Sequence, residues 1–398
     1  MKFLKDIFIN LVAQSLLLVI QQLLLFPHYE EFLGKIDFGT FLTIFGIINT
    51  ISIGLGTSFT NLYQRNYNLA LDNNSYDSEY KKYFYKLIKY FFVCLIPIFL
   101  LFRSIYDDFL VIILAIILTL IITLRIFLIV KYRVQKRFNI ILIFNIILSF
   151  SYSLLVLFDN IDIKSVLFYI IIAEIISFFI LLFMSKILLI NYEKYTFFDK
   201  KMLNVLLISG FAGATMTYSD RLLITYLLSG SAVSIFYIAT LPSKMLLVPF
   251  NMLSSVILSY LADTDVINKK LKKTISYTMP ILCIFIFLIS YFVGLIIIKL
   301  IYPGYITDIK SIYLIVNISF SLTIFDFVIR SFLVKYFSLK IKAIIDVMAL
   351  CLFIALSLLF FTLYKNLFSI AFAQLVTLLL KVTIEYIIFI RLKEDEKN

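Results

Sequence analysis

The sequence predicts an all-α integral membrane protein of about twelve transmembrane helices, in two six-helix bundles around a central cavity. The composition is 62% hydrophobic and only 15% charged, whereas soluble domains are about half apolar and a quarter charged. Apolar runs of about 20 residues recur along the whole chain, and each is long enough to cross a bilayer as a helix. A transmembrane β-barrel would instead show short segments of alternating hydropathy.

The first apolar run follows two lysines, as the apolar region of a signal peptide does. It is about 20 residues long and no small-x-small cleavage pattern follows it, so we interpret it as a retained first helix. The expected spans, with boundaries good to about four residues, are 7–26, 37–60, 84–102, 109–130, 138–158, 165–190, 202–228, 233–261, 275–298, 311–334, 343–363 and 367–390.

Lysine and arginine are concentrated in alternate loops between these spans. Most of the 36 Lys and Arg residues lie at the two termini and in the loops 81–89, 131–137, 186–201, 268–273 and 335–342. Loops rich in Lys and Arg stay on the cytoplasmic side of a membrane. The sequence therefore predicts a multi-pass membrane protein with both termini in the cytoplasm. The net charge of +12 is explained by this orientation, and no nucleic-acid partner is expected.

The loop 186–201 divides the chain into two predicted domains, 1–195 and 196–398, each with six helices. Both halves begin on the same side, as parallel repeats, and transporters built from repeats bind substrate between them. His28 is the single histidine, which excludes a histidine-based metal site. The nucleotide-binding and metalloprotease motifs are missing. We expect no metal and no other cofactor.

Polar residues recur on single faces of several predicted helices, at the spacing of three and four that aligns side chains along a helix. Such stripes either pack on one another or line a hydrated cavity, because lipid does not solvate them. The candidate cargo-binding residues from these stripes are Gln14, Gln21, Lys244, Asn251, Gln374 and Lys381.

Charged residues inside spans are the most informative, because a charge near a helix centre costs roughly 2.5–3.5 kcal/mol on insertion scales. Lys244 and Lys381 lie far from both ends of their spans, which favours a cavity role. Arg221, next to Asp220, lies nearer an end, so ion pairing or snorkelling is the alternative to cargo binding. Arg125 lies near an inner end, where snorkelling is expected.

Acidic residues inside spans are candidates for coupling transport to H+ or Na+. Glu174 lies near the middle of the span 165–190, and an isolated carboxyl there would stay protonated. It either pairs with a lysine or exchanges a cation, and both alternatives remain open. Asp326 and Glu385 are the other coupling candidates.

Two segments resemble a known family. "FLGKIDFGTFLTIFGIINTISIGLG" (32–56) is similar to the first outer loop and second helix of bacterial O-antigen and capsule flippases. "YSDRLLITYLLSGSAVSIFYIATLPSKML" (218–246) resembles their seventh and eighth helices, with Asp220 and Arg221 followed by an aliphatic run, a small-residue turn and Phe236 with Ala239. The resemblance implies the fold of the multidrug/oligosaccharidyl-lipid/polysaccharide exporter superfamily.

The resemblance also implies a flippase that moves polyprenyl-pyrophosphate-linked oligosaccharide, an O-antigen or capsule repeat unit, to the outer leaflet by alternating access. Arg221 and Asp220 take their cargo-binding role from it. Lysine and arginine suit a diphosphate, as a point charge and as a planar fork. Membrane lipids and polysaccharide polymerase machinery are the other expected partners.

Two other function classes fit part of the pattern. An integral-membrane O-antigen polymerase or glycosyltransferase has a similar composition, but it needs a sizeable outer loop, and the predicted outer loops are short. A cation-coupled drug exporter of the same superfamily would have acidic residues dominating its cavity, whereas here basic residues lead among the predicted cavity charges, so the flippase is the main expectation. We therefore expect a transporter rather than an enzyme.

The orientation is tested by labelling single cysteines in a variant that lacks Cys94, Cys283 and Cys351. Cysteine introduced into "DNIDI" (159–163) or "SGSAV" (229–233) should react with an impermeant thiol reagent outside intact cells. Cysteine at position 134 or 271 should react only after permeabilisation, because lysine-rich loops stay inside. The reverse labelling pattern would overturn the predicted orientation.

Overall fold

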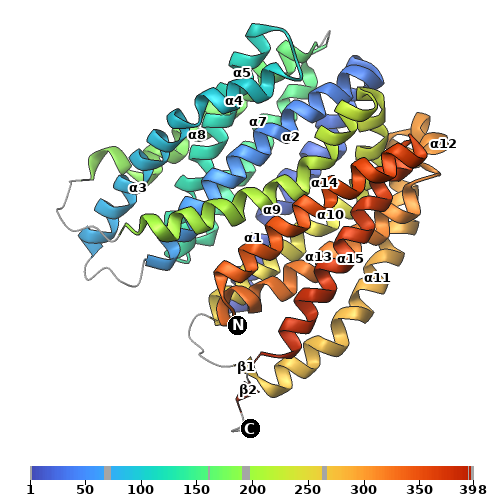
Figure 1. Ribbon diagram of the computed structural model, residues 1–398. Coiled ribbons are helices and arrows are strands. Elements are labelled where there is room, and N and C mark those ends of the chain that lie inside the picture. The colour runs from blue at the N-terminus through green and yellow to red at the C-terminus, as the bar shows by residue number, and fades with distance from the viewer. Residues whose placement is uncertain are drawn as a thin grey trace. The chain divides into compact units, whose positions relative to one another are not determined.

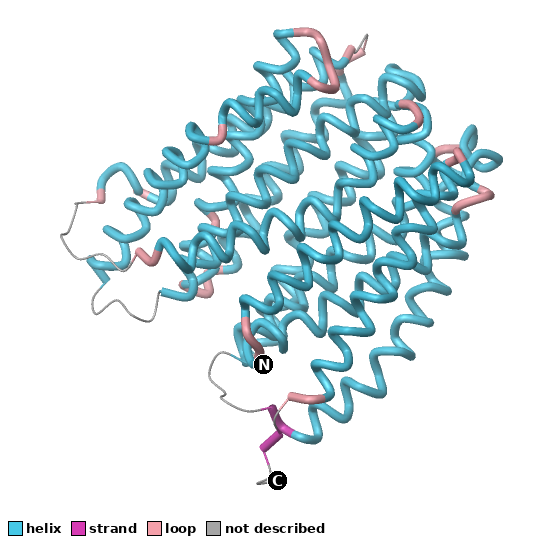
Figure 2. Tube along the Cα trace, in the orientation of Figure 1, coloured by secondary structure: helices cyan, strands magenta, loops and turns pink. Residues whose placement is uncertain are grey.

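The computed structural model describes residues 2–66, 73–159, 162–190, 198–261, 267–392 and 394–395, and these are almost entirely helical (Figures 1 and 2). The all-α fold class expected from the sequence is confirmed. The helices are α1 (Lys2–Ile20), the π-helix η1 (Gln21–Leu25), α2 (Phe26–Asn66), α3 (Asn73–Val93), α4 (Leu95–Arg103), α5 (Phe109–Leu128), α6 (Val130–Val134), α7 (Phe138–Leu154), η3 (Leu155–Leu157), α8 (Ile163–Ser185), η4 (Ile187–Leu189), α9 (Lys200–Leu227), α10 (Gly230–Leu261), α11 (Lys269–Ile301), η5 (Pro303–Tyr305), α12 (Ile306–Ile309), α13 (Tyr313–Tyr336), α14 (Leu339–Tyr364) and α15 (Leu367–Ile390).

Two strands of two residues each, β1 (Ile267–Asn268) and β2 (Glu394–Asp395), pair in parallel near the C-terminus (Figure 2). The ammonium group of Lys272 donates to the carbonyl of Leu392 at 2.8 Å beside them. This contact ties the start of α11 to the segment that follows α15.

In the described part of the chain, ten helices are long and apolar enough to cross a membrane, or eleven if one bent pair counts as a single span. Each predicted span overlaps one of them. The first of the ten, Leu11–Asn66, has 56 residues and covers both predicted spans 7–26 and 37–60. The protein is therefore a multi-pass membrane protein, as expected.

The predicted loop between the first two spans is mostly helical. Pro27 lies inside a continuous helical run, because η1 leads directly into α2 and the backbone N–H of Phe26 donates to the carbonyl of Gln21. Pro27 has no N–H to continue this hydrogen-bonding pattern, yet the helix does not end there. The break comes instead at Gly34, whose φ of 69° and ψ of 173° depart from the helix. Glycine adopts this backbone conformation without the steric cost that a side chain would add.

The predicted span 84–102 is broken at Cys94 into α3 and α4, which are bent by 48°. Pro97, in the first turn of α4, has no N–H to donate to the carbonyl of Val93. A proline that removes a helical hydrogen bond in this way is a common cause of a sharp kink.

The chain forms two compact units, Met1–Leu222 and Leu223–Asn398. In the first unit the most extensive packing joins α2 to α5, α5 to α8 and α1 to α7. In the second, α13 packs on α10, α11 and α15, and α15 packs on α14 (Figure 1). The boundary between the units falls inside α9. The expected division at 195 and 196 was based on helix count, and it stays a prediction.

Small residues allow α9 to approach α2 closely within the first unit. A Cβ added at Gly54 of α2 would lie 2.7 Å from the Phe211 ring, and one added at Gly210 of α9 would lie 2.5 Å from the Ser58 hydroxyl. The Ser58 hydroxyl also donates to the carbonyls of Gly54 at 2.6 Å and of Leu206 at 2.9 Å. Membrane helices pack in this way when small residues bring their backbones together.

Gly54→Ala should therefore destabilise the first unit, because the added methyl group has no space beside Phe211. Overpacking of this kind costs about 1–3 kcal/mol. Thermal unfolding in detergent should show a lower melting temperature for Gly54→Ala. The control is Gly304→Ala, where an added Cβ meets nothing within 4 Å. Equal melting temperatures for the two variants would contradict the close packing.

Candidate functional site

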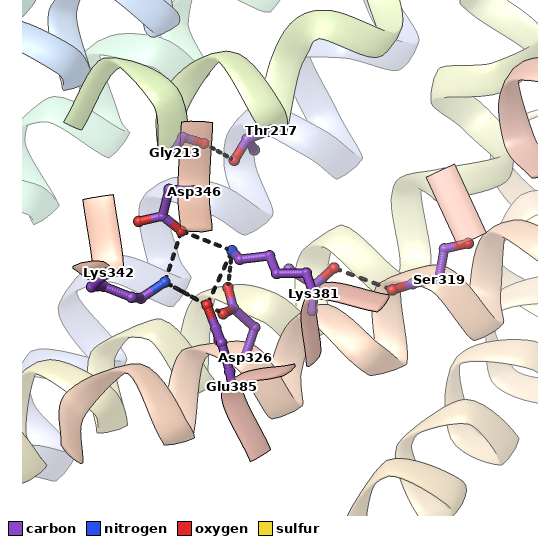
Figure 3. A network of polar contacts seen from close by, with 9 residues as sticks. Gly213, Thr217, Ser319, Asp326, Lys342, Asp346, Lys381 and Glu385 are labelled. Atoms are coloured by element: carbon purple, nitrogen blue, oxygen red, sulfur yellow. Dashed lines mark hydrogen bonds and ion pairs between the residues drawn. The ribbon is translucent and has the colours of Figure 1, made fainter. Parts of the chain in front are cut away.

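Five charged side chains from three helices of the second unit meet in one buried network (Figure 3). The helices that supply them pack on one another, α13 on α15 and α15 on α14. Each of the five side chains is less than a tenth exposed. The network consists of Asp326 on α13, Lys342 and Asp346 on α14, and Lys381 and Glu385 on α15.

The two lysines of this network share the same carboxylates. Lys381 Nζ lies 3.0 Å from Asp326 Oδ2 and 3.2 Å from Asp346 Oδ1. Lys342 Nζ lies 2.7 Å from the same Asp346 oxygen and 2.6 Å from Glu385 Oε1. Longer approaches of 3.9–4.0 Å join Lys381 to Glu385 and Lys342 to Asp326. Each ammonium group therefore lies within 4.0 Å of all three carboxylates.

The charges of these five side chains do not balance. Three carboxylates face two ammonium groups, so full ionisation leaves one negative charge in a buried site, which costs several kcal/mol unless it is compensated. Arg330 is one helical turn from Asp326 on α13, and its positive charge acts on all three acids. The buried oxygens Asp326 Oδ1 and Glu385 Oε2 have no hydrogen-bond partner in the described part of the chain.

The structure brings together three residues that the sequence selected, Asp326, Lys381 and Glu385, and adds two that it missed. The sequence predicts Lys342 in a loop at the end of a span, and it gives no polar stripe that includes Asp346. Their spacing of four residues was the available signal, because side chains at i and i+4 face the same way on a helix. The predicted roles of these residues are not tested by the geometry alone.

The other two candidates described in the second unit lie on α10 and α15. Lys244 is half-buried, with its Nζ 5.2 Å from the ring centroid of Phe320 and 6.0 Å from that of Tyr237. Gln374 is buried, and its side-chain oxygen has no hydrogen-bond partner in the described residues. The side chains of Asn251 in this unit and Gln14 in the first lie outside the described residues. Gln21, in η1, is half-buried.

Arg221 and Asp220 lie on α9 in the first unit, and both are buried. Arg221 Nη1 donates to the carbonyl of Leu42 on α2 at 2.9 Å. Its Cδ would lie 3.1 Å from a Cβ added at Gly46, and its guanidinium is 5.3 Å from the Tyr218 ring centroid. Asp220 Oδ1 accepts from the backbone N–H of Arg221 at 2.8 Å. These contacts tie α9 to α2 and leave the cargo-binding role a prediction.

Glu174 on α8 is fully buried and is held by Arg125 on α5 and Tyr152 on α7. Arg125 Nε lies 2.7 Å from Glu174 Oε2, and Arg125 Nη2 donates to Oε1 at 3.1 Å. The Tyr152 hydroxyl donates to Oε1 at 2.7 Å. The partner is thus an arginine of the same unit rather than a lysine. Arg125 binds this carboxylate as a fork instead of snorkelling to water.

Breaking the Arg125–Glu174 pair should destabilise the first unit. In Glu174→Gln the guanidinium, only 14% exposed, loses its carboxylate, and removing one partner of a buried pair costs about 3–5 kcal/mol. Replacing both residues by apolar ones, Arg125→Met with Glu174→Leu, should recover much of the loss, because no unpaired charge remains. The free energy of unfolding in detergent is compared for the wild type, Glu174→Gln and the double variant. The control is Glu31→Gln, which changes an exposed glutamate. Wild-type stability of Glu174→Gln would contradict a structural pair.

No family model and no curated protein matches the sequence. Solved structures match along almost the whole chain. A MATE crystallised in complex with MaD5 gives a TM-score of 0.69 at 14% identity, covering 98% of this chain and 96% of that chain. A MATE in the straight conformation gives 0.64 at 13%, covering 98% and 94%. An inward-facing multidrug resistance MATE family transporter of the MOP superfamily gives 0.62 at 13%, covering 96% and 93%.

At these identities the likeness concerns the fold. The chain has the fold of transporters of the MOP superfamily, which is the superfamily fold expected from the sequence resemblance. One of the matched structures is described as a multidrug resistance transporter. The narrower flippase family and the cargo stay predictions.

Proposed function

We propose that this protein is an alternating-access membrane transporter that couples export of its cargo to H+ or Na+. The single observation that carries the proposal is the buried network of Asp326, Asp346 and Glu385 around Lys342 and Lys381. Charged side chains inside a membrane bundle are costly and mark ion pathways and proton relays. The fold shared with MATE transporters supports the same conclusion.

The network supplies a simple means of coupling. Its three carboxylates need one more positive charge than the two lysines provide, and either Arg330 or an external cation can supply it. Asp326 Oδ1 and Glu385 Oε2 are the buried oxygens with no hydrogen-bond partner in the described residues, so a cation would bind there. Binding would supply the compensation that the charge of Arg330 otherwise provides, and a ligand that favours one arrangement shifts the balance between conformations.

The cargo that this site favours is a drug-like organic molecule, because acidic residues outnumber lysines in the network. Lys381, which the sequence assigned to a diphosphate, lies within hydrogen-bond reach of Asp326 and Asp346. Its positive charge is therefore already compensated. The match to a multidrug resistance MATE family transporter supports this choice.

The second candidate cargo is polyprenyl-pyrophosphate-linked oligosaccharide, moved from the cytoplasmic to the outer leaflet of the bacterial inner membrane. The segments 32–56 and 218–246 support it through their resemblance to O-antigen and capsule flippases. Lys244 supports it independently, because a cation beside the aromatic rings of Tyr237 and Phe320 suits a sugar diphosphate. Lys244→Ala would then reduce flipping and leave drug export unchanged.

Coupling is tested in proteoliposomes with an imposed pH gradient at fixed Na+, and with a Na+ gradient at fixed pH. One set contains a fluorescent organic cation and the other a fluorescent lipid-linked oligosaccharide, so the cargo that moves identifies the function. Glu385→Gln keeps the shape of the side chain but cannot exchange a proton, so gradient-driven transport should fall at least about tenfold, the scale of a coupling free energy.

The matched control is Glu31→Gln, an exposed glutamate that should retain full gradient-driven transport. Glu174→Gln shows which unit contains the coupling residue. We expect its transport to stay dependent on the imposed gradient, although the variant is less stable than the wild type. If Glu385→Gln responds fully to both gradients, the network has no coupling role. If coupling is lost in Glu174→Gln alone, the coupling residue lies in the first unit.

A further inference from the structure

Helix α3 presents a face of lysines that the transport site does not use. Lys82, Lys86 and Lys89 follow one another at spacings of four and three residues, so they align on one side of the helix. Lys82 and Lys86 are half-buried and Lys89 is exposed. Their positive charges therefore lie close together at the surface. Glu79, three residues before Lys82 on α3, offsets these charges only in part, because one carboxylate acts on several ammonium groups.

The start of α9 adds to this lysine face within the first unit. Lys86 Nζ lies 3.1 Å from the centroid of the Phe198 ring. The exposed Lys200 follows two residues later, and its charge acts on Lys86 together with those of Lys82 and Lys89. The contact with Phe198 holds the Lys86 ammonium group beside the first residues of α9. The positive charges of α3 and of Lys200 are therefore concentrated in one place.

The same face becomes apolar further along the chain. Val93, Ile96 and Leu100 continue the spacing of Lys89 at four, three and four residues, and they are 79%, 70% and 59% exposed. The bend at Cys94 falls between the first and second of them. The cations suit the anionic headgroup of a phospholipid, and the exposed aliphatic side chains suit its acyl chain. The two parts of the face follow one another in the same order as the two parts of the lipid.

We propose that this face, defined as Lys82, Lys86, Lys89 and Lys200 with Val93, Ile96 and Leu100, binds an anionic phospholipid. The headgroup phosphate lies among the lysines, and an acyl chain lies along the aliphatic side chains. Lysine clusters next to a membrane span attract anionic lipids at the membrane surface. A soluble anion would contact the lysines alone, whereas a phospholipid would contact the lysines and the adjoining aliphatic side chains together.

The chain contains no tryptophan, so one introduced tryptophan is a unique fluorescent reporter. Tyr85 is 39% exposed and lies beside Lys86 on the same face. Tyr85→Trp is reconstituted into bilayers that contain brominated phosphatidylglycerol or brominated phosphatidylcholine, which quench tryptophan on contact. We expect phosphatidylglycerol to show a relative binding constant at least about fivefold higher, which is the scale of a single lysine near an anionic membrane surface.

Two comparisons make the result specific to this face. Lys82→Gln, Lys86→Gln and Lys89→Gln, combined in the Tyr85→Trp background, should make the two lipids quench equally. Phe292→Trp on α11, where the native ring is 61% exposed, should show equal quenching without further changes. The proposal would be overturned if the two lipids quenched Tyr85→Trp equally. It would also be overturned if the glutamine variant kept the preference for phosphatidylglycerol, or if Phe292→Trp showed the same preference.

Discussion

The cost of placing a charge inside an apolar helical bundle governs the interior of both units. A charge that cannot reach water is tolerated only when a partner compensates it, and removing one partner of a buried pair costs about 3–5 kcal/mol. Glu174 meets this condition through Arg125 and Tyr152. In the second unit five side chains on α13, α14 and α15 meet it together.

The fold was largely predictable from the sequence, because bilayer thickness sets the length of each apolar run. All the expected spans overlap helices of the structure. Local breaks were harder to place. Proline and glycine indicate that a helix can bend, but the geometry around them decides where it does. Pro27 lies inside α2 without ending it, whereas Gly34 takes the non-helical conformation. Pro97 follows the break at Cys94.

The candidate site was only partly predictable, because periodicity shows which residues share a face but not what the face contacts. The stripe on α15 identified Lys381 and Glu385, but their partners Lys342 and Asp346 come from α14, at a distance in sequence that no spacing rule covers. Arg221 illustrates the same limit. Its neighbour Asp220 accepts from the backbone N–H, and the guanidinium donates to Leu42 on another helix. Gly46 leaves space for that approach.

The two buried ionic groups differ in a way that bears on which of them can exchange a cation. Arg125 and Glu174 form a fork in which one guanidinium meets one carboxylate, and the Tyr152 hydroxyl adds a further hydrogen bond. Protonating Glu174 would leave the arginine without compensation, so this pair resists a change of charge. In the second unit each lysine lies within 4.0 Å of three carboxylates. When one carboxylate gains a proton there, both lysines keep two others. A shared network can therefore gain or lose one positive charge at a lower cost than an isolated pair, and this physical difference is why we propose coupling at Glu385 and Asp326 rather than at Glu174.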